Sequence, residues 1–414
     1  MDRTRVIKEI KKEWEKEPET FPVFLEENPD LFPEIQDGQK RENEGLMEEF
    51  YGRMQKKKAK MPQTEELRKE WEREMEQERK DFLKKERILS LSEWIGPGLF
   101  QEFEKEIKHF LKRIREFDGT LKGGQIWQAM RNYMVYAMIV EMQGEKQNAA
   151  DPVLAYSLLY PYTDNYIDNA GIAKEEKERY NRMIARKLEG KPVTAHSALE
   201  EKTCRLLDMI ENAYEGGARK KVTGTLLQLL EAQHCSIRQQ REEIAEDEVL
   251  GISIWKGGTS VLADYLFSTA DWTKKEEEFY LRFGFALQLV DDLQDMEEDK
   301  KEGSRTLMTE AVKDMRLEER VNRLIWFVWN TLRGFEPKNP ALKGFILKNC
   351  VEMILLESVI NMQFFSAKYI KSLEPYLPFS AGYIKKMKKL QKKSSFVYDM
   401  NIPALEEEHG GNSL

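Results

Sequence analysis

Carboxylates recur at intervals of one helical turn in the segment FALQLVDDLQDMEED, residues 285–299. On a helix, residues four apart lie on one face. Asp291, Asp295 and Asp299 have this spacing, and Asp292 flanks them; these four acids are called here the acidic stripe. Carboxylates in such a row repel one another and lose hydration beside an apolar stretch, and a hard divalent cation such as Mg²⁺ relieves both effects by binding their oxygens. A solvated acidic face on a surface helix is the alternative.

A second apolar segment ends in the same way. In LAYSLLYPYTDNYIDNAG, residues 154–171, Asp164 and Asp168 are four apart, and Pro161 one turn earlier is expected to bend the helix or fix its start. We call Asp164 and Asp168 the first acidic pair. Two mostly apolar helices that face each other across a bundle and end in such acids would form a clamp for metal ions and a diphosphate at the mouth of an apolar cavity.

The elements that must position these acids are helices. Residues 124–144 are apolar on nearly all sides and predict a buried helix, and further helical periodicities are separated by short connections marked by Gly or charge. They cover residues 151–170, 173–188, 198–214, 220–244, 248–269, 274–300, 307–333, 340–370 and 378–393. Alternating strand patterns are missing from the sequence. We therefore expect an all-α core of about ten helices around an apolar cavity.

The composition changes once along the chain, near residue 92. Residues 1–91 are dominated by Glu, Lys and Arg and predict a charged N-terminal extension, helical or partly ordered. Two aromatic pieces within it, residues 21–35 and 44–54, are suited to docking. The letters WIGPGL mark a break, after which we expect the main helical domain over residues 92–396 and a C-terminal tail over residues 397–414.

Composition and cysteine usage exclude several classes of protein. The 414-residue chain has 41% apolar and 34% charged residues, as expected of a folded protein with wet helical faces. Its formal net charge of −8 gives no electrostatic reason to bind nucleic acid. Cys204, Cys235 and Cys350 are far apart and odd in number, which argues against a disulfide framework and a zinc site. Because the sequence shows no signal core and no membrane-span run, we expect a cytoplasmic protein.

The acidic motifs resemble those of the class I isoprenoid synthases. DNYID, residues 164–168, resembles their first aspartate-rich motif in its DxxxD form, and DDLQD, residues 291–295, resembles the second in its DDxxD form. Between them, SIWKGGTSVLADY is similar to the segment in which a Lys followed by small residues approaches the diphosphate. Together with MRNYMVYAMI and EPYLPFS, these motifs are most similar to the bacterial large-terpene synthases, the group that includes tetraprenyl-β-curcumene synthase, and more distantly to squalene and phytoene synthases. The likeness covers about residues 92–390.

The resemblance implies an isoprenoid-synthase bundle in which three Mg²⁺ ions bind an allylic prenyl diphosphate that ionises to a carbocation. At the matching positions, the catalytic metal ligands would be Asp164, Asp168, Asp291 and Asp295, with Asp292 and Asp299 as further ligands. The basic residues beside the motifs that would hold the diphosphate are Lys256, Lys301 and Arg305. Ordinary surface charge is the alternative for these basic residues.

The cavity needs an apolar lining that does not quench a cation. Aromatic faces stabilise a nearby positive charge by ~0.5–2 kcal/mol. A glycine inside a helix costs about 1 kcal/mol relative to Ala, which a close approach to substrate would explain. The expected lining residues are Tyr133, Tyr136, Tyr162, Gly257, Gly258, Gly284 and Gln288. Core packing is the alternative for the tyrosines, and a tight helix crossing is the alternative for the glycines.

We expect a class I terpene synthase, a lyase that ionises one long linear prenyl diphosphate and releases a cyclic or acyclic terpene and diphosphate without a nucleotide or organic cofactor. The DxDD acid of protonation-initiated cyclases is missing from the sequence. A chain-elongating prenyltransferase is the second choice, since this chain lacks the usual arginine pair after the first motif. A head-to-head prenyltransferase and a non-catalytic lipid- or partner-binding protein are further alternatives. We expect a monomer or homodimer. The basic residues 381–393 predict a solvated last helix or, alternatively, a peripheral contact with an anionic membrane.

Overall fold

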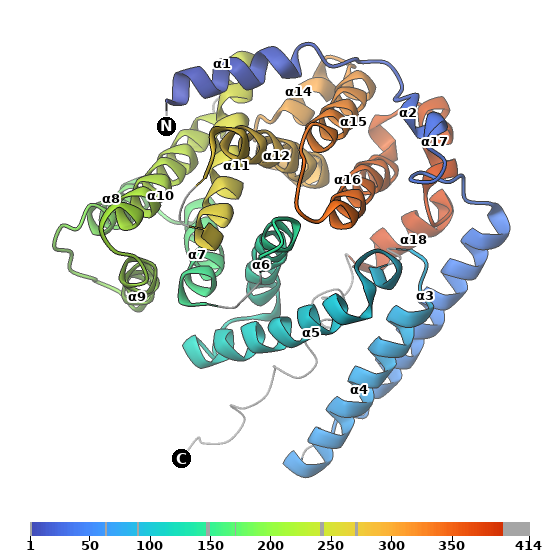
Figure 1. Ribbon diagram of the computed structural model, residues 1–414, viewed down its shortest axis with the longest axis horizontal. Coiled ribbons are helices and arrows are strands. Elements are labelled where there is room, and N and C mark those ends of the chain that lie inside the picture. The colour runs from blue at the N-terminus through green and yellow to red at the C-terminus, as the bar shows by residue number, and fades with distance from the viewer. Residues whose placement is uncertain are drawn as a thin grey trace. The chain divides into compact units, whose positions relative to one another are not determined.

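The structure, a computed structural model, describes residues 2–62, 64–88, 91–145, 150–169, 171–240, 244–269 and 272–391. These residues form eighteen α-helices, α1 to α18, and three short 3₁₀ helices, and they contain no β-strand (Figure 1). The expected all-α class is therefore confirmed. No helix in the described ranges is both long and apolar enough to cross a bilayer.

The chain divides into two compact units, whose bounds differ from the predicted domain boundaries. Unit 1 consists of Met1–Phe24 and Gln128–Ser366, and unit 2 of Leu25–Trp127 and Ala367–Leu414. The division does not follow residue 92, because the first 24 residues pack with the helices that carry the acids. The acidic stripe and the first acidic pair both belong to unit 1.

Unit 1 is a helical bundle in which α11 is the most central element. Its helices, with α6 entering from unit 2, are α1 (Arg3–Trp14), α6 (Gly123–Met142), α7 (Asp151–Asp168), α8 (Lys174–Leu188), α9 (Ala198–Asn212), α10 (Gly216–Ser236), α11 (Glu246–Thr269), α12 (Lys274–Gln294), α13 (Met296–Glu302), α14 (Leu307–Lys313), α15 (Leu317–Arg333) and α16 (Pro340–Ile360). Figure 1 shows α11 between α10 and α12, and it also contacts α1, α7 and α14. This central position explains why α11 is apolar on nearly all sides.

Two glycines let α11 and α12 cross at backbone contact. Gly257 of α11 faces Gly284 of α12, and a Cβ atom built on either residue would overlap the carbonyl oxygen of the other. A Cβ atom on Gly258 would lie 3.0 Å from the carbonyl oxygen of Leu281. These three glycines were expected to line a cavity. The structure places them in a tight helix crossing, which was the alternative explanation for glycines inside a helix, where they lower helix stability.

The first helix is part of the core of unit 1 and not a loose extension. Trp14 is fully buried, and its ring lies 5.4 Å from that of Phe285 on α12 and 5.7 Å from that of Phe327 on α15. Next to it, Glu13 accepts a hydrogen bond of 2.8 Å from Arg282 on α12. The helix that carries the acidic stripe is therefore held from its other side by residues near the N-terminus.

The two aromatic pieces of the N-terminal region dock as expected. In unit 1, the Phe24 ring stacks on Trp329 of α15 at 4.1 Å. In unit 2, Phe32 and Phe50 are both buried. The high charge of the first 91 residues therefore accompanies packed helices, because most of their aromatic side chains are buried.

Unit 2 contains long charged helices. They are α3 (Asp37–Lys58), α4 (Glu65–Lys85), α5 (Leu91–Phe117), α17 (Ala367–Leu373) and α18 (Ala381–Gln391), with the short α2 (Phe24–Glu27) at the start of the unit. α3 and α4 pack through a small cluster that includes Phe50, Met54, Trp71 and Met75. The break expected at WIGPGL is a kink in α5, where Gly96 has φ 70°. The predicted tail, residues 397–414, lies outside the described residues.

Turns divide three of the expected long helices, so the count exceeds the expected ten. Residues 274–300 form α12 and α13, residues 307–333 form α14 and α15, and residues 340–370 form α16 and α17. The first break is at Asp295, and the second contains Met315 with a left-handed φ of 57°. Hydrophobic periodicity continues through such turns, so it does not reveal them.

Candidate active site

The acidic stripe spans the end of α12 and the short helix α13. Asp291 and Asp292 are in the last turn of α12, Asp295 joins the two helices, and Asp299 is in α13. The N–H of Asp295 donates to the carbonyl of Asp291 at 2.9 Å, and the N–H of Asp299 donates to that of Asp295 at 2.9 Å. These α-helical hydrogen bonds continue across the junction, so Asp291, Asp295 and Asp299 remain stacked on one face.

Burial and mutual repulsion raise the pKa values of three carboxyl groups of the stripe. Burial and the charges of Asp299 and Asp291 raise the pKa of Asp292 to about 8. Burial and neighbouring carboxylates also raise the pKa of Asp295 to about 6 and that of Asp299 to about 7. The positive charge of Lys256 on α11 lowers all three pKa values. The stripe is therefore a site of concentrated negative potential that a lysine faces from α11.

Asp292 is buried, with 6% of its surface exposed. Its Oδ1 atom accepts a hydrogen bond of 2.9 Å from Nε2 of Gln288. Within the described residues, the buried Oδ2 atom of Asp292 has no hydrogen-bond partner. Gln288, expected in a cavity lining, thus holds a carboxylate of the stripe, and a cation at Oδ2 would supply the missing partner.

Replacing Asp292 with asparagine should stabilise the metal-free protein at high pH. The pKa of about 8 in the folded protein lies above the ordinary value of 3.8. Between these values the folded carboxyl keeps a proton that the unfolded one has lost, so the free energy of unfolding falls as the pH rises. Asparagine mimics the neutral carboxyl and removes this loss. We expect the variant to gain about 2 kcal/mol or more over wild type between pH 5 and pH 8.

Urea unfolding of both proteins in EDTA at pH 5 and pH 8 measures this gain. The comparison of variant with wild type at each pH cancels the titration of groups that do not interact with Asp292. An equal difference in unfolding free energy at the two pH values would contradict the assignment of a buried, proton-bearing Asp292.

The first acidic pair lies in the last turn of α7. The Oδ1 atom of Asp164 accepts a hydrogen bond of 2.7 Å from Nε2 of Gln233 on α10. Asp168 is the last residue of α7, and its side chain lies outside the described residues. Pro161 is inside α7 and does not mark its start, and its carbonyl accepts a hydrogen bond of 2.9 Å from the Asn165 side chain. Asp164 is thus anchored to a neighbouring helix before any ligand binds.

Polar contacts fix the register between α7 and α11. Asn132 of α6 donates to Ser157 of α7 at 3.1 Å and to Asp264 of α11 at 3.2 Å. About one turn further along α7, the Tyr160 hydroxyl pairs with the Ser260 hydroxyl, one turn earlier on α11. The two helices therefore run in opposite directions here. Burial raises the pKa of Asp264 well above its usual range, and the Asn132 side chain acts against this rise through its hydrogen bond.

The next turn of each helix brings the acids of α7 to the lysine that faces the stripe. Asp164 follows Tyr160 by four residues, and Lys256 precedes Ser260 by four. Continuing the same register places Asp164 at the level of Lys256. Lys256 also lowers the pKa values of Asp292, Asp295 and Asp299, so the helix register relates it to Asp164 and its charge relates it to the stripe.

Helix α6 joins the two acidic segments by a second route. The Gln128 side chain accepts a hydrogen bond of 3.2 Å from Asn165, which follows Asp164 on α7. One turn later on α6, an Nη atom of Arg131 lies 3.9 Å from Oδ1 of Asp291. Sequence analysis did not single out Arg131, because a lone arginine in an apolar run carries no motif. Two independent contacts therefore bring both segments to one end of the bundle.

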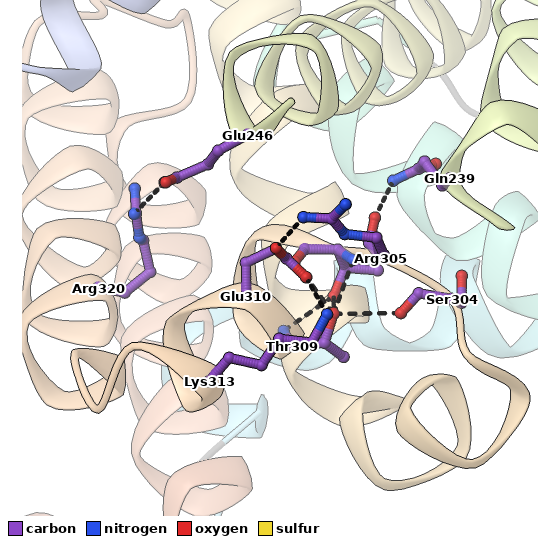
Figure 2. Close-up of polar contacts among 9 residues, drawn as sticks. Gln239, Glu246, Ser304, Arg305, Thr309, Glu310, Lys313 and Arg320 are labelled. Atoms are coloured by element: carbon purple, nitrogen blue, oxygen red, sulfur yellow. Dashed lines mark hydrogen bonds and ion pairs between the residues drawn. The ribbon is translucent and has the colours of Figure 1, made fainter. Parts of the chain in front are cut away.

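Two of the three predicted diphosphate-binding residues have other partners. The Arg305 guanidinium binds Glu310, which raises the pKa of Arg305, and the Arg305 carbonyl accepts a hydrogen bond of 3.0 Å from Gln239 (Figure 2). Lys301 is exposed and lies 3.7 Å from Glu297 on its own helix. Of the three, Lys256 alone is coupled to the stripe through the pKa values above.

A small pocket opens between α7, α8, α9 and α10. Tyr160, Thr163 and Gln233 line it next to Asp164, and its other walls are mainly leucine and isoleucine side chains. Its volume is about 40 Å³, well below the ~300–1,000 Å³ of typical ligand pockets. The pocket therefore has room for a few atoms of a ligand beside the first acidic pair.

None of the seven residues expected to line a cavity lines this pocket. Tyr133 and Tyr136 are buried on α6 with ring centroids 6.0 Å apart, and Tyr162 is buried on α7. These tyrosines pack in the core of unit 1, and core packing was the alternative to a cavity lining for them. An apolar cavity over these side chains stays a prediction.

The donor set of the site fits a hard divalent cation. Among the described residues, no three acidic, histidine or cysteine side chains converge as a ready metal site, and the Asp168 side chain is outside that set. The stripe nonetheless offers carboxylate oxygens whose raised pKa values show the energetic cost of leaving them without a cation. Asp292 offers a buried oxygen with no described donor. Oxygen ligands of this type are those that Mg²⁺ prefers.

Comparison with known proteins returns no match for this chain. No protein-family model matches it, and neither a curated protein nor a solved structure does. The side chains at the end of α7 and α12 are therefore the observations that bear on function.

Proposed function

We propose that this protein is a class I terpene synthase that uses Mg²⁺ to ionise a long linear prenyl diphosphate and releases a terpene and diphosphate. The observation that carries the proposal is the register of α7 and α11, which sets Asp164 level with Lys256, while Lys256 also faces the acidic stripe. The register and the charge of Lys256 thus relate two acidic segments that are 127 residues apart in sequence (291 − 164). Such an arrangement suits a polyanion held between metals and a basic side chain.

Each side chain at this end of the bundle has a task in the proposal. Asp164 and Asp168 would hold Mg²⁺ on one side and Asp291 and Asp295 on the other, and bound Mg²⁺ supplies charge neutralisation of the leaving diphosphate. Lys256 adds a positive charge from α11.

The amides of the site position these carboxylates. Gln233 orients Asp164, and Gln288 orients Asp292. Because these amides already hold the carboxylates in place, little reorganisation is needed when the substrate binds.

The test is incubation of the full-length protein with prenyl diphosphates of ten to thirty-five carbons, with Mg²⁺ or with EDTA, followed by extraction and mass spectrometry. A Mg²⁺-dependent hydrocarbon from one substrate supports the proposal and gives its chain length. Longer diphosphates that form only with added isopentenyl diphosphate would indicate an elongating prenyltransferase. No product under any condition would shift the assignment to a helical protein that binds a lipid or partner without catalysis.

A further inference from the structure

The acidic stripe is faced by cations from two helices, and only one of them was expected. Lys256 on α11 was the expected cation, and Arg131 comes from α6, where its guanidinium lies 3.9 Å from Asp291. Arg131 therefore adds a positive side chain from a second helix at this end of the stripe.

The contact of Arg131 with Asp291 is loose. A separation of 3.9 Å is longer than a hydrogen bond, and about half of each side chain is exposed, 51% for Arg131 and 47% for Asp291. An exposed ion pair of this kind contributes little to stability. The planar guanidinium has five N–H donors in a fork that matches two phosphate oxygens, and one distant carboxylate does not use this capacity.

The position of Arg131 on α6 adds a second reason. Gln128, one turn before it, binds Asn165 beside Asp164, so this face of α6 touches both acidic segments. Arg305 differs in this respect, because its guanidinium is engaged by Glu310, which also binds Lys313 at 2.7 Å (Figure 2). Arg131 is thus the arginine whose contacts place it at the meeting point of the two segments.

We propose that Arg131 is a diphosphate-binding residue, which pairs with Asp291 in the free protein and turns its guanidinium to the diphosphate oxygens when the metal-bound substrate enters. Mg²⁺ held by Asp291 would compensate the carboxylate that attracts Arg131 in the free protein, and the diphosphate would compensate Arg131. The proposal rests on the function proposed above and adds a residue from α6 to the site.

Isothermal titration calorimetry with inorganic diphosphate and Mg²⁺ tests this assignment on the full-length chain. We expect Arg131→Gln to weaken diphosphate binding by about 10- to 100-fold, as for a lost hydrogen bond between charged groups. Arg131→Lys should lie between this variant and wild type, since lysine keeps the charge and loses the fork. The matched control is Arg182→Gln on α8, which removes an exposed arginine 3.5 Å from Glu178 and should leave the affinity within about twofold of wild type.

The outcomes separate this proposal from the proposed function. If both Arg131 variants bind diphosphate as tightly as wild type does, Arg131 is not a ligand of the diphosphate. The terpene synthase proposal still stands in that case, provided that the wild-type protein binds diphosphate and turns over a prenyl diphosphate. If wild type neither binds Mg²⁺-diphosphate nor converts any prenyl diphosphate, both proposals are overturned. Urea unfolding of each variant shows whether weaker binding reflects a damaged fold, and Arg131→Lys provides a second measurement if Arg131→Gln is unstable.

Discussion

Replacing Asp164 or Asp291 with asparagine should lower kcat by roughly 10³-fold while the protein stays folded. Asparagine keeps the size of each side chain and removes the negative charge that would hold Mg²⁺ against the diphosphate. An asparagine at position 164 can still accept the hydrogen bond from Gln233, and Asp291 is half exposed. Neither substitution therefore opens a cavity. The loss is therefore expected in turnover and not in folding.

The measurement is product formation at saturating Mg²⁺ and substrate, with unfolding curves of the same preparations. The matched control is Asp30→Asn, an exposed acid in unit 2, which should retain wild-type turnover. Turnover that persists in both site variants would show that the two acidic segments do not hold the metal. A loss in one variant alone would restrict the metal site to the helix that carries that residue.

The parts of this protein that follow from local pattern were predictable from the sequence. Helical periodicity gave the all-α class, and the start and end of α7 were expected within two residues. The one-turn spacing of Asp291, Asp295 and Asp299 survives the break between α12 and α13, because the backbone hydrogen bonds continue through it. Local sequence determines such features, since residues four apart remain neighbours wherever the helix lies.

Features that depend on long-range packing did not follow from the sequence. Arg131 is 160 residues from Asp291 (291 − 131), and only the tertiary fold brings the two side chains near each other. Proximity in sequence was misleading for Arg305, which follows the acidic stripe closely, because the chain turns at Gly303 (φ 75°) and presents the guanidinium to Glu310. A sequence motif shows which residues are close in sequence. The ion-pair partner of a charged side chain depends on how the backbone turns after the motif.

Trp14 illustrates the same limit at the N-terminus. Its neighbours in sequence are mostly charged, which predicted an exposed or partly ordered helix. Its partners, Phe285 and Phe327, are about 270 or more residues away and become visible only when α12 and α15 pack side by side. Together with Val6 and Ile10, which are buried on the same helix, this one large aromatic side chain makes a mostly charged segment part of the core.

Replacing Gly257 or Gly284 with alanine should destabilise unit 1 by more than about 3 kcal/mol, at the upper end of overpacking effects. A methyl group on either residue would overlap the backbone carbonyl of the other, and backbone on both sides prevents a simple side-chain adjustment. The helices would have to separate along their whole contact, which is the longest in the bundle. Lys256 precedes Gly257 directly, so the same separation would move it away from the acidic stripe and reduce turnover as well.

Glycines on the same helix provide graded controls for this prediction. A Cβ atom on Gly251 of α11 would lie 3.7 Å from Ile7, an ordinary contact, so Gly251→Ala should be neutral or stabilise by up to about 1 kcal/mol through helix propensity. Gly258→Ala should be intermediate, because its Cβ atom would lie 3.0 Å from the Leu281 carbonyl oxygen. Urea unfolding of the four alanine variants measures the loss in free energy of unfolding. We expect the largest losses for Gly284→Ala and Gly257→Ala, a smaller loss for Gly258→Ala and the smallest effect for Gly251→Ala. Similar stability of the Gly251→Ala and Gly257→Ala variants would contradict a backbone contact at this crossing, and the positioning of Lys256 would then need another cause.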